Sequence, residues 1–162
     1  IAGRLTAHKN PSFAVDAWKL AGYPETLYII GQGPEQFSCP GIKTLKWQDH
    51  TQFLERLGQV RALLFPSKWQ EPYGILGIES LASDTPVLAC ASGGMNAWMG
   101  KGTMAVSSAQ EMAHEMQSIL SGEARWNQKP FRAPSYWSRQ RALSLGKWSA
   151  LVTAVAAKNN AL

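Results

Sequence analysis

Two carboxylates stand where a buried strand is expected to give way to a helix. In the stretch FPSKWQEPYGILGIESLASDTPVLA (residues 65–89), the strand should end at Phe65 and the helix should run through residues 74–82. Glu71 falls at the junction, and Glu79 lies two turns inside the helix, about 12 Å further along. Glu71 could complement the helix dipole and Glu79 could face solvent; the functional alternative is a ligand that both carboxylates contact.

The start of this helix favours an anionic ligand. A helix N-terminus carries unpaired N–H groups and a partial positive charge, and Gly74 removes side-chain bulk between Tyr73 and Ile75. The neighbours of Glu79 make the helix largely buried, so a carboxylate without a partner would be costly there. These apolar neighbours are Leu76, Ile78 and Leu81.

A second candidate site is the loop GRLTAHKN, which follows the first expected strand. It carries Arg4 and Lys9, and two cations on one strand-to-helix loop suit a phosphate or diphosphate. The alternative is a pair of solvated surface charges. His8 lies in the same loop, whereas His50 and His114 have no metal-ligand spacing and are expected on helix surfaces without a role.

Paired glycines follow two further strands. Gly31 and Gly33 in GQGPEQ superficially suggest a dinucleotide fingerprint, but Gln36 stands in place of its third glycine. Gly93 and Gly94 follow a later strand in CASGGMN. Each pair predicts either a tight turn or the close approach of a ligand to the backbone.

The elements that must position these residues alternate along the chain. Strands are expected at residues 1–5, 26–33, 42–47, 61–67, 86–92 and 103–106. Helices are expected at residues 10–22, 50–60 and 74–82, after a Ser108–Glu111 capping box, and at 136–157. The first of these helices has Asn10 as its N-cap, Pro11 at its first position and Gly22 past its end.

The alternation predicts an α/β fold, a Rossmann-like three-layer α/β/α domain with a parallel sheet. The apolar run RALLFPS is typical of a strand buried on both faces of such a sheet. In these sheets ligands bind at the carboxyl ends of the strands, where the candidate loops lie. We expect this domain over residues 1–134 and a C-terminal helix at 135–162 that packs on it. The opening IAGRL reads as the end of a strand, which suggests a fragment.

Composition narrows the functional class. The chain has 162 residues, of which 45% are hydrophobic and 17% charged, so it is long enough and apolar enough for a real core. No apolar run approaches a membrane span, and the net charge of +5 is scattered, which argues against a nucleic-acid site. Cys39 and Cys90 have no metal or redox spacing, which is typical of reduced cytoplasmic thiols.

Taken together, the motifs resemble a known family. GRLTAHKN, IIGQGP, the stretch at residues 65–89 and SGG are similar to the C-terminal half of a GT-B glycosyltransferase, most of all family 4, which is retaining and uses nucleotide-sugars. Glu71 and Glu79 match its E-x7-E signature, and Arg4 and Lys9 match its R-x4-K pair. The resemblance runs to about residue 120 and is looser in the last helix.

The resemblance implies a role for each residue. Arg4 and Lys9 would bind the donor diphosphate, Glu79 the ribose hydroxyls, and Glu71 the hydroxyls of the transferred sugar. The backbone around Gly74 would assist, and Gly33 would lie in the donor site. On this basis the catalytic candidates are Glu71, Arg4 and Lys9, and the donor-binding set adds Gly33, Tyr73, Gly74, Ile75 and Glu79.

Three departures from the family pattern stand out. Asp84 replaces a usual glycine, although aspartate tolerates a left-handed backbone comparatively well. Ala97 occupies the position of a usual glutamate and is followed by Trp98 and Met99. The N-terminal acceptor domain is absent from this sequence.

The implied activity is retaining transfer from a nucleoside diphosphate sugar to a glycan or lipid-linked acceptor, with no metal or other cofactor required in principle. The isolated chain is expected to be inactive. Its expected setting is polysaccharide biosynthesis in the cytoplasm, with the full-length protein at the inner membrane face as a further option. Alternatives are a non-catalytic nucleotide- or partner-binding domain and another GT-B enzyme such as a sugar-nucleotide epimerase.

Overall fold

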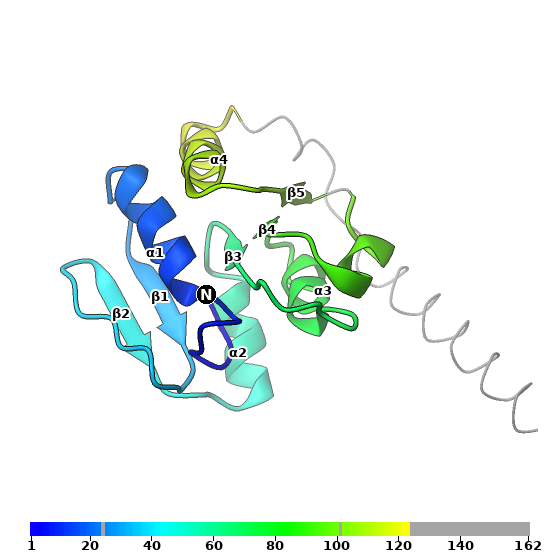
Figure 1. Ribbon diagram of the computed structural model, residues 1–162, viewed down its shortest axis with the longest axis horizontal. Coiled ribbons are helices and arrows are strands. Elements are labelled where there is room, and N and C mark those ends of the chain that lie inside the picture. Colours follow the sequence, from blue (N-terminus) through cyan, green and yellow to red (C-terminus); the bar gives the residue numbers. More distant parts are fainter. Residues whose placement is uncertain (24, 101, 124–162) are drawn as a thin grey trace, which may run out of the picture. The chain divides into compact units, whose positions relative to one another are not determined.

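The structure, a computed structural model, describes residues 1–23, 25–100 and 102–123. Strands and helices alternate along these residues as the sequence predicts (Figure 1). The strands are β1 (Leu27–Ile30), β2 (Ile42–Leu45), β3 (Leu63–Phe65), β4 (Val87–Ala89) and β5 (Thr103–Ala105). The helices are α1 (Pro11–Leu20), α2 (His50–Leu57), α3 (Ile75–Ala82), α4 (Ala109–Ser121) and the short 3₁₀ helix η1 (Gly93–Ala97).

All strand pairs are parallel, and the strands form two separate sheets. β1 pairs with β2, and β4 lies between β3 and β5. The strand expected at residues 1–5 is reduced to one bridge, between Ala2 and Ile30. This segment bonds to the β1 side alone: the Gly3 N–H donates to the Ile30 carbonyl and the Leu5 N–H to the Gln32 carbonyl, both at 2.9 Å. The described residues supply no backbone bond between this segment and β3, so it does not join the two sheets.

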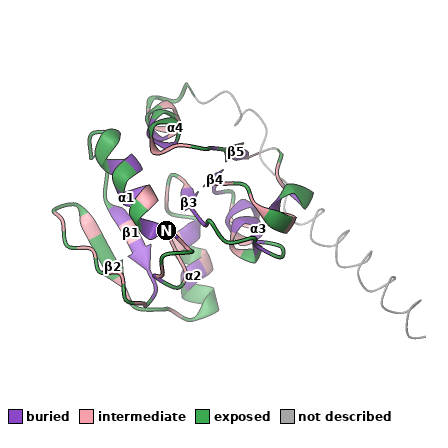
Figure 2. Cartoon of the chain, in the orientation of Figure 1, coloured by how far each residue is buried: buried purple, intermediate pink, exposed green. Residues whose placement is uncertain are grey.

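Side chains alternate between two helical layers. Leu64 of β3 and Leu88 of β4 belong to the core that α1 and α4 build with β1. α2 contacts α3, and α3 contacts β3 and β4. Because successive strand residues point to opposite faces, this arrangement gives the expected three layers, with buried residues along the strands (Figure 2).

At the helix ends, the structure follows some of the capping and turn signals of the sequence and not others. Gly22 and Asp84 adopt left-handed backbone, at φ 88° and 55°, so the turn with Asp84 survives without glycine. Asn10 is the N-cap of α1 but is itself left-handed, and its side chain makes no capping bond. The Ser108 side chain caps α4 by accepting from the Glu111 N–H, whereas the Glu111 carboxylate turns to Ser107 instead of closing the expected capping box.

The remaining expectations concern the C-terminal part of the chain. The domain boundary at residue 134 and the helix expected at 135–162 lie outside the described residues. Within the described ranges, none of the helices combines the length and the apolar character that crossing a bilayer requires.

Candidate functional site

The carboxylate of Glu71 lies in a buried polar cluster after β3. Its Oε1 is contacted by the ammonium group of Lys9 and accepts a 2.8 Å hydrogen bond from the Ser67 hydroxyl. Glu71 and Ser67 are buried, while about a quarter of the Lys9 side chain is exposed. The structure therefore brings together the first strand-to-helix loop and the loop after β3, as the motifs predict. Ser67 is a partner that the sequence did not single out.

Backbone bonds hold these two loops together. The N–H groups of Lys68 and Trp69 both donate to the His8 carbonyl, at 2.9 and 3.1 Å. Arg4 and Lys9 line the same small hollow beside Ser67. Arg4 is exposed and takes part in none of the ion pairs of the described residues, so its guanidinium faces solvent next to Lys9.

The first turn of α3 offers free donors beside Glu71. Gly74 is the left-handed N-cap, at φ 71°. In the described part of the chain, the N–H groups of Tyr73, Gly74 and Ile75 donate to no backbone oxygen, whereas the Gly77 N–H bonds to the Gly74 carbonyl. Ile75 and Tyr73 are exposed. Unpaired N–H groups thus stand at the helix end where an anionic ligand is expected from the sequence.

Trp98 packs against the first turn of α3. Its indole N–H donates to the Tyr73 carbonyl, and its ring packs against Gly77. The residues before it, Gly93–Ala97, form a 3₁₀ helix. Ala97 is the last residue of this turn, and the buried indole of Trp98 that follows it contacts α3.

In both glycine pairs, close contact with a neighbouring backbone leaves no room for a side chain. A Cβ at position 31 would lie 1.8 Å from the Gly3 carbonyl oxygen, and one at position 33 would lie 2.1 Å from the Leu5 carbonyl oxygen. A Cβ on Gly94 would lie 1.9 Å from the Pro72 carbonyl oxygen. The glycines therefore let neighbouring loops touch through their backbones. The Gly94 N–H also donates to the Glu71 carbonyl at 2.7 Å, which fixes the backbone of the candidate catalytic residue.

The Glu79 carboxylate on α3 has a side-chain partner on α2. Its Oε1 lies 2.8 Å from Nε2 of His50, the first residue of α2. About a fifth of the Glu79 side chain is exposed, against two thirds of the His50 side chain. The sequence assigned His50 no role, and no motif links it to Glu79, since the contact depends on how α2 and α3 pack.

Two further findings concern the thiol of Cys90 and the arrangement of possible metal ligands. Burial raises the pKa of the Cys90 thiol, and the charge of Lys68 offsets this only in part, so the thiol stays protonated at neutral pH. Within residues 1–23, 25–100 and 102–123, His, Cys, Asp and Glu side chains form no group of three that could hold a metal.

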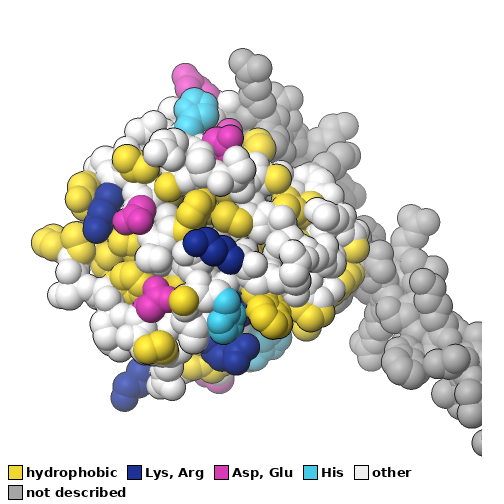
Figure 3. All heavy atoms as spheres, in the orientation of Figure 1, with side chains coloured by type: hydrophobic (Ala, Val, Ile, Leu, Met, Phe, Trp, Pro, Cys, Tyr) yellow, Lys and Arg dark blue, Asp and Glu magenta, His cyan; other side chains and the backbone are white. Residues whose placement is uncertain are grey.

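Figure 3 shows Lys and Arg dispersed on the face in view rather than gathered into one patch.

Comparison with known proteins decides the family. Residues 1–132 match the family described as "Glycosyl transferases group 1". The chain belongs to this family. Glycogen synthase of Mycobacterium tuberculosis is 32% identical over 133 residues, which cover 80% of this chain and 31% of that protein. The chain thus spans about a third of the length of the curated relatives that it matches.

Solved structures show the same fold as this family member. Sucrose-phosphate synthase from Thermosynechococcus elongatus matches with a TM-score of 0.76 at 23% identity, over 94% of this chain and 44% of that one. The pneumococcal O-GlcNAc transferase in complex with UDP and GlcNAc matches with 0.72 at 22% identity, over 95% and 35%. The Anabaena protein HepE in complex with UDP gives 0.68 at 18%, over 90% and 47%. The expected Rossmann-like half of a GT-B fold is confirmed.

Proposed function

We propose that this chain is the donor-binding domain of a retaining glycosyltransferase that uses a nucleoside diphosphate sugar. The observation that carries the proposal is the meeting of Lys9 and Glu71 beside the free first turn of α3. A cation, a buried carboxylate and a positive helix end then face one place, at the edge where parallel α/β sheets bind ligands. Family membership and the UDP-bound structures with this fold support the same assignment.

Each group has a separate task in this proposal. Arg4 and Lys9 hold the diphosphate together with the N–H groups of Tyr73, Gly74 and Ile75. Glu71 accepts hydrogen bonds from the sugar hydroxyls, and Glu79 from the ribose hydroxyls. Gly33 keeps the backbone beside Leu5 and Arg4 in place, and so shapes the floor of the donor site.

Transfer would develop negative charge on the leaving diphosphate. Arg4, Lys9 and the first turn of α3 would stabilise that charge, so we propose that no metal or other cofactor is needed. A hexose is the proposed sugar, and a glycan or a lipid-linked molecule the proposed acceptor. The acceptor must be positioned by a second domain, so we expect no turnover from these 162 residues alone, because orientation supplies much of the rate in such sites.

The second candidate is a doubly wound domain that binds a nucleotide or a protein partner without chemistry. Ala97, which replaces a usual glutamate, is the observation in its favour. An epimerase acting on sugar-nucleotides would use the same diphosphate contacts. With a complete cleft, a transferase would move the sugar from the donor to an acceptor, whereas neither of these two candidates would.

Binding of nucleotides to the isolated chain tests the proposal. Calorimetry or NMR titration should show UDP, GDP or ADP binding at roughly 0.1–1 mM, since only one side of the cleft is present, and each monophosphate should bind more weakly. Arg4→Gln should reduce this preference for the diphosphate without lowering the melting temperature. Arg61→Gln is the matched control, because among the described residues Arg61 forms an ion pair only with the exposed Glu25. Equal affinity for mono- and diphosphates would contradict the proposal.

A further inference from the structure

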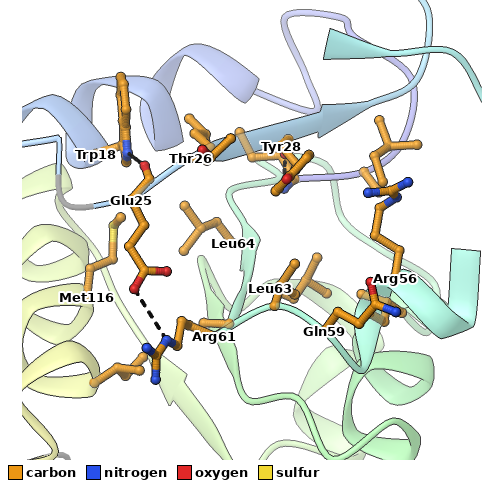
Figure 4. Close-up of a pocket in the computed structure, with 18 of the residues that line it drawn as sticks. Trp18, Glu25, Thr26, Tyr28, Arg56, Gln59, Arg61, Leu63, Leu64 and Met116 are labelled. Carbon is orange, nitrogen blue, oxygen red and sulfur yellow. Dashed lines mark hydrogen bonds and ion pairs between the residues drawn. The ribbon is translucent and has the colours of Figure 1, made fainter. Parts of the chain in front are cut away.

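Helix α2 presents two sets of side chains to its neighbours. Phe53, Arg56 and Leu57 line a hollow of about 530 Å³ between β1 and β3 (Figure 4). Phe53 and Leu57 are buried, so they hold the helix in place. His50, the first residue of α2, is not among the residues that line this hollow, and it contacts Glu79 of α3 instead.

The start of α2 is held without help from the His50 side chain. The Asp49 carboxylate caps the helix by accepting a 3.0 Å hydrogen bond from the Gln52 N–H. Trp47, which lies just before the cap, stacks on Phe53 with 5.8 Å between the ring centroids. About two thirds of the His50 side chain is exposed, and its ring takes part in neither contact. The helix can therefore begin at this place without an imidazole.

The contact with His50 divides the two oxygens of the Glu79 carboxylate. A carboxylate can only accept hydrogen bonds, so Nε2 of His50 must carry the proton in its 2.8 Å contact with Oε1. Among the groups that the structure describes, none donates a hydrogen bond to Oε2. The Ser83 hydroxyl bonds to the backbone carbonyl of Glu79 and leaves its side chain untouched. Oε1 is thus held by the protein, and Oε2 remains for a ligand.

Glu79 lies close to the unpaired N–H groups at the start of α3. It follows the exposed Ile75 by four residues, so the two side chains lie on one face of the helix. The rise along the axis from Gly74 to Glu79 is about 7.5 Å at 1.5 Å per residue. This separation suits a ligand whose anionic group meets the helix end and whose hydroxyls lie one sugar unit away, as in a nucleoside diphosphate.

We propose that His50 is a positioning residue for the ribose of the donor: its Nε2–H holds Oε1 of Glu79 and thereby orients Oε2 toward the ribose hydroxyls. A glutamate side chain that is already held loses less conformational freedom when a ligand binds than one that is free. This inference rests on the proposed function, in which Glu79 accepts from the ribose. It adds a group from α2 to a site that the motifs place on α3 and the two loops beside it.

Two substitutions separate the N–H donor of His50 from its ring. His50→Gln places an amide N–H near the position of Nε2, whereas His50→Phe keeps a planar ring without a donor. In NMR or calorimetric titrations, His50→Phe should weaken UDP about three- to ten-fold, and His50→Gln less than about two-fold. Binding of 2′-deoxy-UDP should change less than about two-fold in either variant, because this ligand lacks one of the hydroxyls that the oriented carboxylate would recognise.

A double variant tests whether His50 acts through Glu79. In a Glu79→Ala background, His50→Phe should change UDP affinity less than about two-fold, since no carboxylate is left to orient. His114→Phe is the matched control, because it removes an exposed imidazole from α4 and should leave UDP binding unchanged. Thermal melts should show that the single variants at position 50 fold, because the His50 side chain is largely exposed.

Three results would overturn the role of His50 and leave the proposed function intact. UDP binding that is equally tight in His50→Phe and the wild type would make the pair a surface contact without effect. Equal losses in the Gln and Phe variants would mean that the N–H donor is not responsible. A loss that persists in the Glu79→Ala background would mean that His50 does not act through Glu79. By contrast, a wild-type chain that binds no UDP would refute the proposed function, and the role of His50 with it.

Discussion

The Lys9 ammonium group contacts Oε1 of Glu71, although 62 positions separate the two residues in the sequence. The same carboxylate oxygen accepts the Ser67 hydroxyl. Without a ligand, the cation proposed to hold a diphosphate is thus already partnered by the carboxylate proposed to hold the sugar. A donor that enters the site has to share these groups or rearrange them.

Removal of Lys9 should therefore affect both stability and binding. Lys9→Met leaves the buried Glu71 carboxylate with Ser67 as its remaining side-chain partner, and we expect the free energy of unfolding to fall by about 1–3 kcal/mol. Diphosphate affinity should fall as well. Lys46→Met, at an exposed position, is the control for loss of one positive charge. Urea denaturation beside calorimetry separates the two effects.

A double variant tests whether the contact itself is responsible. Glu71→Gln removes the charge that Lys9 neutralises, so Lys9→Met should cost less stability in that background. If the two substitutions are additive, the contact contributes nothing measurable and the cluster is not an ion pair in solution.

The two glutamates should differ in what they recognise. Glu79→Ala should weaken free UDP and the UDP-sugar alike, by about 1.5–3 kcal/mol, since it removes the proposed ribose contact. Glu71→Ala should weaken only the sugar-bearing donor. Titrations with both ligands, beside thermal melts, check this. Equal loss of bare UDP affinity in both variants would refute the division, and loss of stability without loss of affinity would make both carboxylates structural.

Trp98 and Gly77 form a tight packing contact that a single methyl group should disturb. A Cβ at position 77 would lie 2.2 Å from Cη2 of Trp98, so Gly77→Ala should lower the free energy of unfolding by about 1–3 kcal/mol. Gly58→Ala is the matched control, because its nearest neighbour would lie at 3.6 Å and its backbone is right-handed. Chemical denaturation measures both. A Trp98→Leu background should reduce the cost of Gly77→Ala, and an unchanged cost would place the strain elsewhere.

A polypeptide prepared to begin at Ile1 should show a pH dependence of stability, because its amino group is buried. Burial lowers its pKa from 8.0 to about 5, so between these values the unfolded chain binds more protons than the folded one. Stability should therefore rise with pH across this window, by up to about 4 kcal/mol for a three-unit shift. Urea denaturation at several pH values measures the rise.

An N-acetylated chain is the control for this pH dependence, because it keeps every other titrating group. Hydrogen bonds from Ser107 lower the pKa of Glu111, so its contribution is lost only as the pH falls through the acid range, below the window. Burial raises the pKa of Cys90, which therefore titrates above it. If the acetylated and free chains show the same slope, the amino group is not buried in solution.

Local sequence signals predicted the parts of the fold that depend on a few neighbouring residues. Alternating apolar runs located the strands β1 to β5 and the helices α1 to α4, and the junction between Phe65 and Gly74 was placed correctly, whereas the short helix η1 was not predicted. The left-handed turn at Asp84 followed from the chemistry of aspartate. Such features are decided within one or two turns of chain, so their causes are present in the sequence itself.

Contacts between distant elements were not predictable in the same way. The His50–Glu79 pair depends on the packing of α2 against α3, and neither residue carries a signal of the other. The strand predicted at residues 1–5 is reduced to a single bridge with β1, and the apolar pattern does not report how far a segment pairs. Asn10 is a good capping residue by type, but its backbone is left-handed and its side chain accepts no capping bond from an N–H of the helix.

The carbonyl oxygens close to Gly31, Gly33 and Gly94 have a practical consequence for anyone who wants to alter the proposed donor site of this domain. Random libraries that include these positions would mostly sample chains that cannot close their loops, since any side chain there would overlap a backbone oxygen. Diversity is better placed at Arg4, Tyr73 and Ile75, whose exposed side chains can be exchanged without moving the main chain. The same glycines would serve as fixed anchor points if loops were grafted from another family member.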